Sequence, residues 1–201
     1  LGTTFLGFEV PRLKILYLAL EDTPYRIADR LRKLAKGMGI DLDQLLPPAN
    51  GGPDTVHYGD VTIVTAWSYL SEHGMGDLRA TMDRDRPDVV IIDTFSRILG
   101  RGDQMDQQEM TRTMAALQRL AAEHQAAILL IDHHRKSART SPDADPIDDI
   151  MGSTAKAGVV DCAMGLYRRH NQNEAKLKLS GRDFGDSELT IEWDPNAFCW
   201  N

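Results

Sequence analysis

Acidic and histidine side chains directly follow three apolar runs of the sequence. A carboxylate on rigid backbone supplies the hard oxygen ligand that Mg²⁺ prefers, and Mg²⁺ keeps several waters while it contacts phosphates. A second carboxylate nearby can orient a water for attack on a phosphate, and a histidine can contact that phosphate. The residues in such positions are Glu21, Asp22, Asp93, Thr94, Asp132, His133 and His134.

Four apolar runs must hold these side chains in place: residues 15–20, 61–64, 89–92 and 128–131. Continuous runs of this length that are rich in Val and Ile are typical of parallel strands covered by helices on both faces. Ligands of open α/β sheets bind at the carboxyl ends of such strands. The pattern therefore predicts that the polar residues converge at one edge of a sheet.

Helical patterns lie between the runs. Thr23 followed by Pro24 predicts a helix start, and Gly37 predicts a left-handed end to that helix. A second helical repeat begins near Met110 and extends to about His124. Strands that alternate with helices indicate right-handed crossovers and a doubly wound sheet.

The period of the pattern changes near the C-terminus. Apolar and polar residues alternate over 176–179 and 189–194, which predicts an antiparallel hairpin, and a further strand is expected near 162–167. Residues 47–60 and 137–150 contain Pro, Gly and Ser clusters and are predicted to be irregular. The sequence therefore predicts an α/β fold with a doubly wound, mostly parallel sheet and a C-terminal antiparallel hairpin.

Each polar residue also has a structural interpretation. Asp93 alone is equally well explained as a cap for the following turn, and Glu21 and Asp22 precede a predicted helix, where negative charge is favourable. His133 and His134 are adjacent, so they point to opposite faces if the strand continues and do not chelate one metal together. Their convergence with the carboxylates favours the functional interpretation.

Composition excludes several classes of protein. The charge sum of 23 − 30 = −7 argues against a generally cationic nucleic-acid binder, although a local basic groove is compatible with it. Two cysteines exclude a disulfide-rich scaffold and a cysteine-only zinc site. No apolar run approaches the roughly 20 residues of a membrane span. We expect a cytoplasmic protein without a membrane segment.

The ordered series of motifs resembles the RecA-like P-loop ATPases, in the branch of the RepA-type plasmid replicative helicases and related phage and mobile-element ATPases. In chain order the motifs are LGFEVP (6–11) with ILYLALED (15–22), VVIIDT (89–94), IDHHRK (131–136), GSTAKAG (152–158) and GRD (181–183). They resemble the segment after the phosphate loop, the Walker B strand, the sensor strand, the following glycine-serine helix start and the terminal hairpin. The resemblance covers nearly the whole chain.

This resemblance implies ATP and Mg²⁺ as cofactors and a role for each matching residue. Asp93, with Thr94 beside it, would hold Mg²⁺ through water, and Glu21 would be the catalytic base. His134, or alternatively His133, would contact the γ-phosphate.

The resemblance also implies a hexameric ring in which one subunit reaches the nucleotide of its neighbour. Lys156 and Arg182 are the candidates for that contact. At the position where the plasmid helicases carry a finger arginine, this chain has Asp161, so the role would have moved to one of these two residues or be absent. Arg182 is explained nearly as well as a solvated turn residue.

A glycine-rich phosphate loop of the form G-x-x-x-x-G-K-[ST] does not occur in the 201 residues. Lys156 follows Gly152 at a similar spacing, but no glycine precedes it directly and the segment comes after the predicted sensor strand. We expect residues 1–201 to form a single RecA-like ATPase core whose first strand, phosphate loop and first helix lie upstream of Leu1.

A basic cluster follows the predicted sensor strand: Arg135, Lys136 and Arg139. In the resembling family such a loop faces the ring's channel, so these residues would bind the phosphates of single-stranded DNA with salt-dependent affinity. A solvated loop, balanced by the aspartates after it, is the alternative.

Two other functions are compatible with parts of the pattern. One is a RecA-like regulatory or recombination ATPase that has no helicase activity. The other is a metal-dependent phosphohydrolase that uses Asp93, Asp132 and His133, which would leave Glu21 unexplained.

Overall fold

The computed structural model describes residues 3–40, 54–100, 107–133, 146–149, 156, 158–183 and 185–201, without the side chains of residues 3–5 and 148. The chain divides into two compact units. The first comprises Leu1–Asp103 and Ala116–Ile131, and the second comprises Gln104–Ala115 and Asp132–Asn201.

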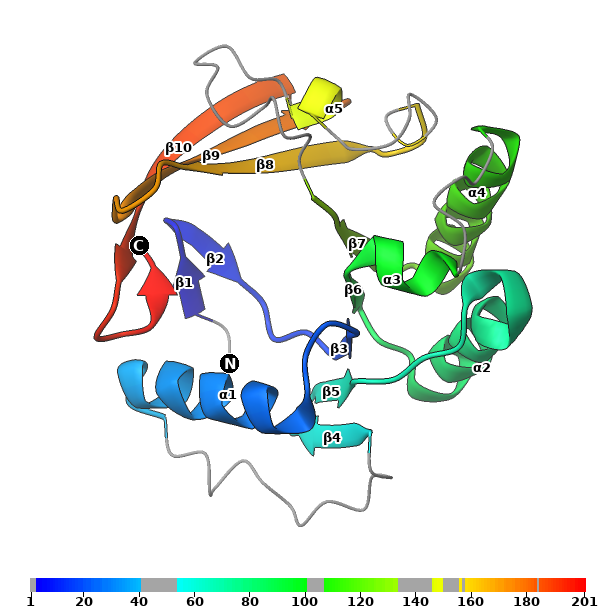
Figure 1. Ribbon diagram of the computed structural model, residues 1–201, viewed down its shortest axis with the longest axis horizontal. Coiled ribbons are helices and arrows are strands. Elements are labelled where there is room, and N and C mark those ends of the chain that lie inside the picture. The colour runs from blue at the N-terminus through cyan, green and yellow to red at the C-terminus, as the bar shows by residue number, and fades with distance from the viewer. Residues whose placement is uncertain are drawn as a thin grey trace. The chain divides into compact units, whose positions relative to one another are not determined.

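The first unit contains a five-stranded sheet of order β4-β5-β3-β6-β7 (Figure 1). Strands β5, β3, β6 and β7 are parallel, and β4 pairs with β5 in the antiparallel sense. All four apolar runs predicted as strands form the parallel part, so that prediction is confirmed. The strands are β3 (Ile15–Ala19), β4 (Thr55–Tyr58), β5 (Val61–Val64), β6 (Val89–Asp93) and β7 (Ala127–Ile131).

Helices lie on both sides of this sheet: α1 on one side, and α2 with the end of α4 on the other (Figure 1). On the α1 side, Ala19 of β3 and Ile63 of β5 form a buried cluster with Ile27 of α1. The opposite faces of the same strands are also buried, with Leu18 and Ile92 fully inaccessible to solvent. Burial on both faces explains why the runs are apolar without alternation, and each such side chain contributes roughly 1.5–3 kcal/mol. The helices are α1 (Pro24–Gly37), α2 (Met75–Asp85), α3 (Phe95–Leu99) and α4 (Gln107–His124).

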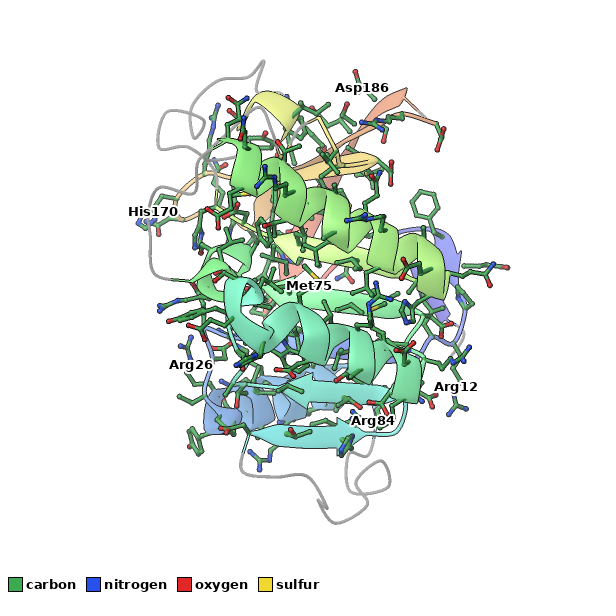
Figure 2. The ribbon with its side chains drawn as sticks, turned by 90° about the vertical axis from the view of Figure 1, so that its right-hand side faces the viewer. Arg12, Arg26, Met75, Arg84, His170 and Asp186 are labelled. Atoms are coloured by element: carbon green, nitrogen blue, oxygen red, sulfur yellow. The ribbon has the colours of Figure 1, made fainter. Side chains whose placement is uncertain are left out.

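The end of α4 is fixed against α2 by two side-chain contacts, on the face that Figure 2 presents. Arg79 Nη1 lies 2.5 Å from Glu123 Oε2, and His124 Nε2 lies 3.0 Å from Asp83 Oδ1. Because α4 leads almost directly into β7, these contacts also set where β7 begins.

Helix α1 begins where the sequence predicted but ends differently. Thr23 Oγ1 accepts a hydrogen bond from the Arg26 amide at 3.4 Å, which is the predicted N-cap. The predicted left-handed end at Gly37 is wrong. The Met38 amide still donates to the Leu34 carbonyl, so helical hydrogen bonding continues, and Gly39 takes the left-handed conformation instead, with φ of +67°.

Several elements of the first unit had no clear sequence signal. Strands β1 (Thr3–Phe5) and β2 (Phe8–Val10) form a hairpin whose turn residues, Leu6 and Gly7, both have positive φ, as two-residue hairpin turns require. Strand β4 lies in the segment predicted to be irregular, and a short π-helical turn, η2 (Leu70–Gly74), precedes α2. Within the described ranges, no helix has the length and apolarity needed to cross a membrane.

The second unit contains a four-stranded antiparallel sheet of order β11-β10-β9-β8. In the predicted hairpin of β9 and β10, Leu177 lies opposite Leu189 and Ala175 opposite Ile191, as the alternation required. These strands form a sheet of their own and do not extend the parallel one. A helical turn, α5, interrupts the segment predicted to be irregular. The elements are α5 (Pro146–Asp149), β8 (Cys162–Arg168), β9 (Glu174–Gly181), β10 (Gly185–Asp194) and β11 (Cys199–Trp200).

Candidate active site

Two carboxylates meet at the carboxyl ends of neighbouring strands. In the parallel pairing of β3 with β6, Ala19 lies opposite Asp93, so Glu21 follows β3 at the edge where β6 ends. The Leu20 amide donates to the Asp93 carbonyl at 2.6 Å and ties the two strand ends together. The peptide bond from Asp93 to Thr94 is cis. The predicted convergence therefore holds for Glu21, Asp93 and Thr94.

Glu21 is held by the loop that follows β6. Thr94 Oγ1 donates a hydrogen bond to Glu21 Oε1 at 3.0 Å, and Arg97 Nε lies 3.4 Å from the same oxygen. Thr94 is only 2% exposed and also lies 3.0 Å from Ser96 Oγ, whereas the Glu21 side chain is 37% exposed. A carboxylate anchored from the protein side and open to solvent is suited to orienting a water molecule.

Asp93 is held by a residue that the sequence did not single out. The Tyr17 hydroxyl, on β3, donates to Asp93 Oδ2 at 2.7 Å, and both side chains are half-buried. Burial, followed by the bond to Asp93 and the negative charge of that carboxylate, raises the pKa of Tyr17 well above its usual range. Tyr17 therefore remains a hydrogen-bond donor at all physiological pH values.

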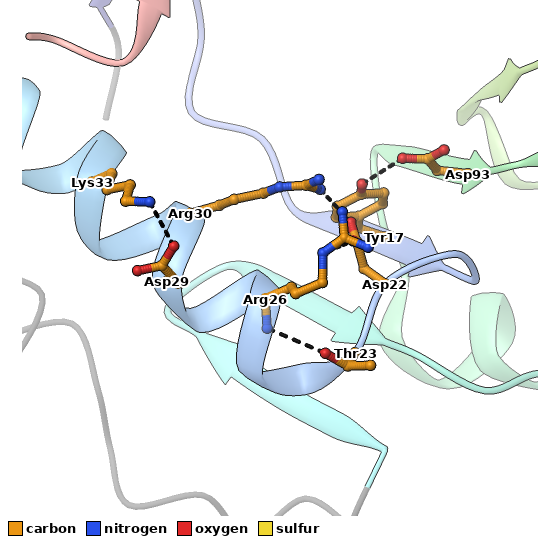
Figure 3. A network of polar contacts seen from close by, with 8 residues as sticks. All are labelled: Tyr17, Asp22, Thr23, Arg26, Asp29, Arg30, Lys33 and Asp93. Carbon is orange, nitrogen blue, oxygen red and sulfur yellow. Dashed lines mark hydrogen bonds and ion pairs between the residues drawn. The ribbon is translucent and has the colours of Figure 1, made fainter. Parts of the chain in front are cut away.

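Asp22 faces α1, in contrast to Glu21 (Figure 3). It forms ion pairs with Arg30 and with Arg26, whose Nε lies 3.3 Å away, and its side chain is only 7% exposed. The structural interpretation of an acid before a helix is therefore correct for Asp22. Glu21 contacts the loop after β6, so that interpretation does not account for it.

The residues at this edge fit a magnesium ion that is held mostly by water and phosphate. Among the described residues, no three His, Cys, Asp or Glu side chains gather as a metal-binding group. Mg²⁺ commonly takes only one or two carboxylates from the protein. Asp93 Oδ2 accepts from Tyr17, and in the described part of the chain Oδ1 accepts no hydrogen bond, which leaves a hard oxygen for such an ion.

In the second unit, Lys156 and Asp132 form a buried ion pair. Lys156 Nζ lies 2.5 Å from Asp132 Oδ2, and Lys156 is only 8% exposed. Asp132 Oδ1 accepts the backbone amide of His133 at 2.9 Å, and the His133 side chain is exposed. A contact from Lys156 to a neighbouring subunit would require this pair to separate, and the role stays a prediction.

Arg182 lies in the turn between β9 and β10 and is half-exposed. Its Nη2 donates to the Gly158 carbonyl at 2.7 Å, and its Nη1 lies 3.7 Å from Asp161 Oδ1. The two positions considered for the finger residue therefore contact each other within one chain. The other site residues predicted from sequence lie outside the described residues: His134, Arg135, Lys136 and Arg139.

Comparison with known proteins gives a family and a fold. The family model described as AAA domain matches residues 1–139. Comparison with curated protein sequences gave no match. Among solved structures, the chain is similar to the ATPase domain of a helicase, with a TM-score of 0.63, 12% identity, and coverage of 92% of this chain and 73% of that one. It is also similar to the RadB recombinase, with a TM-score of 0.60, 14% identity, and coverage of 92% and 77%.

At these identities the solved structures establish the fold, whereas the family match covers well over half of the chain. The ordered motifs, the mostly parallel sheet and the paired carboxylates agree with both. The chain belongs to the AAA domain family and has the fold of a RecA-like P-loop ATPase.

Proposed function

We propose that the protein is the ATP-hydrolysing motor core of a hexameric, replicative-helicase-like protein that acts on DNA. The observation that carries this proposal is the pair of strand ends at which Thr94, directly after Asp93, holds Glu21 by a 3.0 Å hydrogen bond. One carboxylate is thereby placed for a metal and another for a water, at the edge where α/β folds bind ligands. We propose a cytoplasmic location and a single ATPase core over residues 1–201.

Hydrolysis would divide its tasks between the two carboxylates. Asp93, with Thr94 beside it, would hold Mg²⁺ through water, and that ion would neutralise charge on the phosphates of ATP. Glu21 would orient the attacking water and accept its proton. Thr94 and Arg97 fix the position of Glu21 Oε1, so the base needs no reorganisation during the reaction.

The remaining roles follow the family resemblance. His134, or alternatively His133, would contact the γ-phosphate, and Lys156 or Arg182 would reach the nucleotide of the next subunit. The expectation that a phosphate loop lies upstream of Leu1 stays a prediction, and the coding sequence before Leu1 tests it directly.

Single-stranded DNA is the proposed nucleic-acid partner. Its phosphates would be bound by Arg135, Lys136 and Arg139, which form a local basic cluster in a chain of net charge −7. Because such binding releases counterions, its affinity should fall steeply with salt concentration.

A second candidate is a RecA-like recombination or regulatory ATPase that does not separate strands. The structural similarity to the RadB recombinase favours it. It requires the same ATP site and therefore the same roles for Glu21 and Asp93. The phosphohydrolase alternative gains no support from the described residues, where no three-residue metal-binding group is found.

The two candidates are separated by DNA-dependent assays on the protein expressed from its complete coding sequence. Single-stranded DNA should stimulate ATP hydrolysis, a forked duplex should be separated with ATP, and light scattering should give six subunits per particle. Asp93→Asn should abolish both activities while circular dichroism remains unchanged. DNA-stimulated hydrolysis without strand separation would favour the second candidate, and no hydrolysis of ATP would overturn both.

A further inference from the structure

Tyr17 is a polar residue inside an otherwise apolar strand. Its ring packs against the cluster of Ala19, Ile27 and Ile63 on the α1 side of the sheet. Its hydroxyl extends beyond that cluster to Asp93 Oδ2 on the neighbouring strand, at 2.7 Å (Figure 3). A phenylalanine would satisfy the packing equally well, so the packing alone does not account for the hydroxyl.

The strand register explains how Tyr17 reaches Asp93. Tyr17 lies opposite Ile91 on β6, and Asp93 is two residues further along the same strand, opposite Ala19. Residues two apart on a strand project from the same face. Tyr17 and Asp93 are therefore diagonal neighbours on one face of the sheet.

The other nearby acid, Asp22, is already engaged. Arg26 and Arg30 of α1 both pair with Asp22, whereas the hydrogen bond of the Tyr17 hydroxyl goes to Asp93 (Figure 3). A phenol has a single O–H to donate. The two arginines therefore occupy the competing acceptor, and Tyr17 donates to Asp93.

We propose that Tyr17 is a positioning residue for the metal-binding carboxylate, because its hydroxyl holds Asp93 Oδ2 and leaves Oδ1 as the oxygen for the metal. This inference rests on the proposed function, in which Asp93 holds Mg²⁺. Without the hydroxyl, the carboxylate can rotate about its Cβ–Cγ bond, and Mg²⁺ must order it at the expense of binding.

The test measures how strongly Mg²⁺ increases nucleotide affinity, without any hydrolysis. The Kd of the slowly hydrolysed analogue ATPγS is measured by calorimetry in EDTA and in MgCl₂, on the protein expressed from its complete coding sequence, and the ratio gives the metal coupling. Tyr17→Phe should reduce this ratio about tenfold, the effect of losing one hydrogen bond to a charged group, with the Kd in EDTA unchanged. Tyr58→Phe is the matched control, since Tyr58 packs on the same cluster from β4 and should leave the ratio unchanged.

Asp93→Asn separates failure of this inference from failure of the proposed function. If Asp93→Asn leaves the ratio at its wild-type value, Asp93 does not hold the metal and both fail. If Asp93→Asn removes the coupling but Tyr17→Phe does not reduce it, only the inference is overturned. In the Asp93→Asn background, Tyr17→Phe should produce no further loss, and a second full loss there would mean that Tyr17 acts through another group.

A measurement on the unmutated tyrosine covers the case in which Tyr17→Phe fails to fold. With 3-fluorotyrosine at the five tyrosine positions, one ¹⁹F resonance should shift both on Asp93→Asn and on addition of MgCl₂ with ATPγS. If the resonance that responds to Asp93→Asn does not respond to Mg²⁺ and ATPγS, the proposed link between Tyr17 and the metal is refuted.

Discussion

Replacement of Thr94 by valine should slow ATP hydrolysis without unfolding the protein. The buried Thr94 hydroxyl donates to Glu21 Oε1 at 3.0 Å, and a hydrogen bond to a charged group contributes about 1.5–3 kcal/mol. Valine has nearly the same shape, so the site stays filled. Arg97 is 3.4 Å from the same oxygen and 64% exposed, so it compensates little. If the lost energy appears fully in the transition state, kcat falls by about 10- to 150-fold.

The assay is steady-state ATP hydrolysis at saturating ATP, on the protein expressed from its complete coding sequence. Thr94→Ser is the matched control, because it keeps the hydroxyl and should retain kcat within a few-fold. In a Glu21→Gln background, Thr94→Val should cost almost nothing more, since the residue that it positions is already disabled.

Two results would refute this reasoning. A Thr94→Val enzyme within about threefold of wild type would mean that the hydrogen bond does not position the base. An equal additional loss in the Glu21→Gln background would mean that Thr94 acts on the reaction through some other contact, and the magnitude given above would not apply.

Three further predictions concern ionisation, stability and DNA binding. Without metal or nucleotide, wild type should lose stability relative to Tyr17→Phe as pH rises above the ordinary tyrosine value of 10.0, by at most about 1.4 kcal/mol per pH unit, because the unfolded chain releases this proton while the folded one, with its raised pKa, retains it; parallel urea-unfolding profiles would contradict this. Lys156→Met should cost about 3–5 kcal/mol in urea unfolding by leaving the buried Asp132 charge uncompensated, with a cost below 1 kcal/mol counting against a stabilising pair. Arg135→Ala with Lys136→Ala should flatten the salt dependence of single-stranded DNA binding by about one or two units, and an unchanged slope would mean that this cluster does not contact DNA.

The parallel sheet could be predicted because its signal is set by burial alone. Strands β3, β5, β6 and β7 are covered on both faces, so nearly every residue in them is apolar. Strand β4 escaped prediction because it is a short edge strand, with the sequence Thr-Val-His-Tyr, inside a segment rich in proline and glycine. Its pairing with β5 is a tertiary feature that local sequence does not encode.

The candidate site could be predicted only to the level of strand ends. Parallel topology brings Glu21 and Asp93 to one edge, but it does not determine which neighbour each side chain contacts. That Asp22 turns to α1 while Glu21 turns to Thr94 depends on side-chain conformations. The pair of Lys156 with Asp132 joins residues 24 apart without any shared period, so no pattern in the sequence indicated that Lys156 is buried.

The most direct test of the central claim, that Glu21 and Asp93 form an ATP-hydrolysing site, is single-turnover hydrolysis by Glu21→Gln. The protein expressed from its complete coding sequence is mixed with limiting radiolabelled ATP and MgCl₂, and bound and hydrolysed ATP are measured in the same samples. The variant should bind Mg-ATP as wild type does and hydrolyse it about 10² to 10⁴ times more slowly, the usual contribution of a positioned base. Hydrolysis within a few-fold of wild type would contradict the assignment and leave Glu21 as a carboxylate that only fixes the loop after β6.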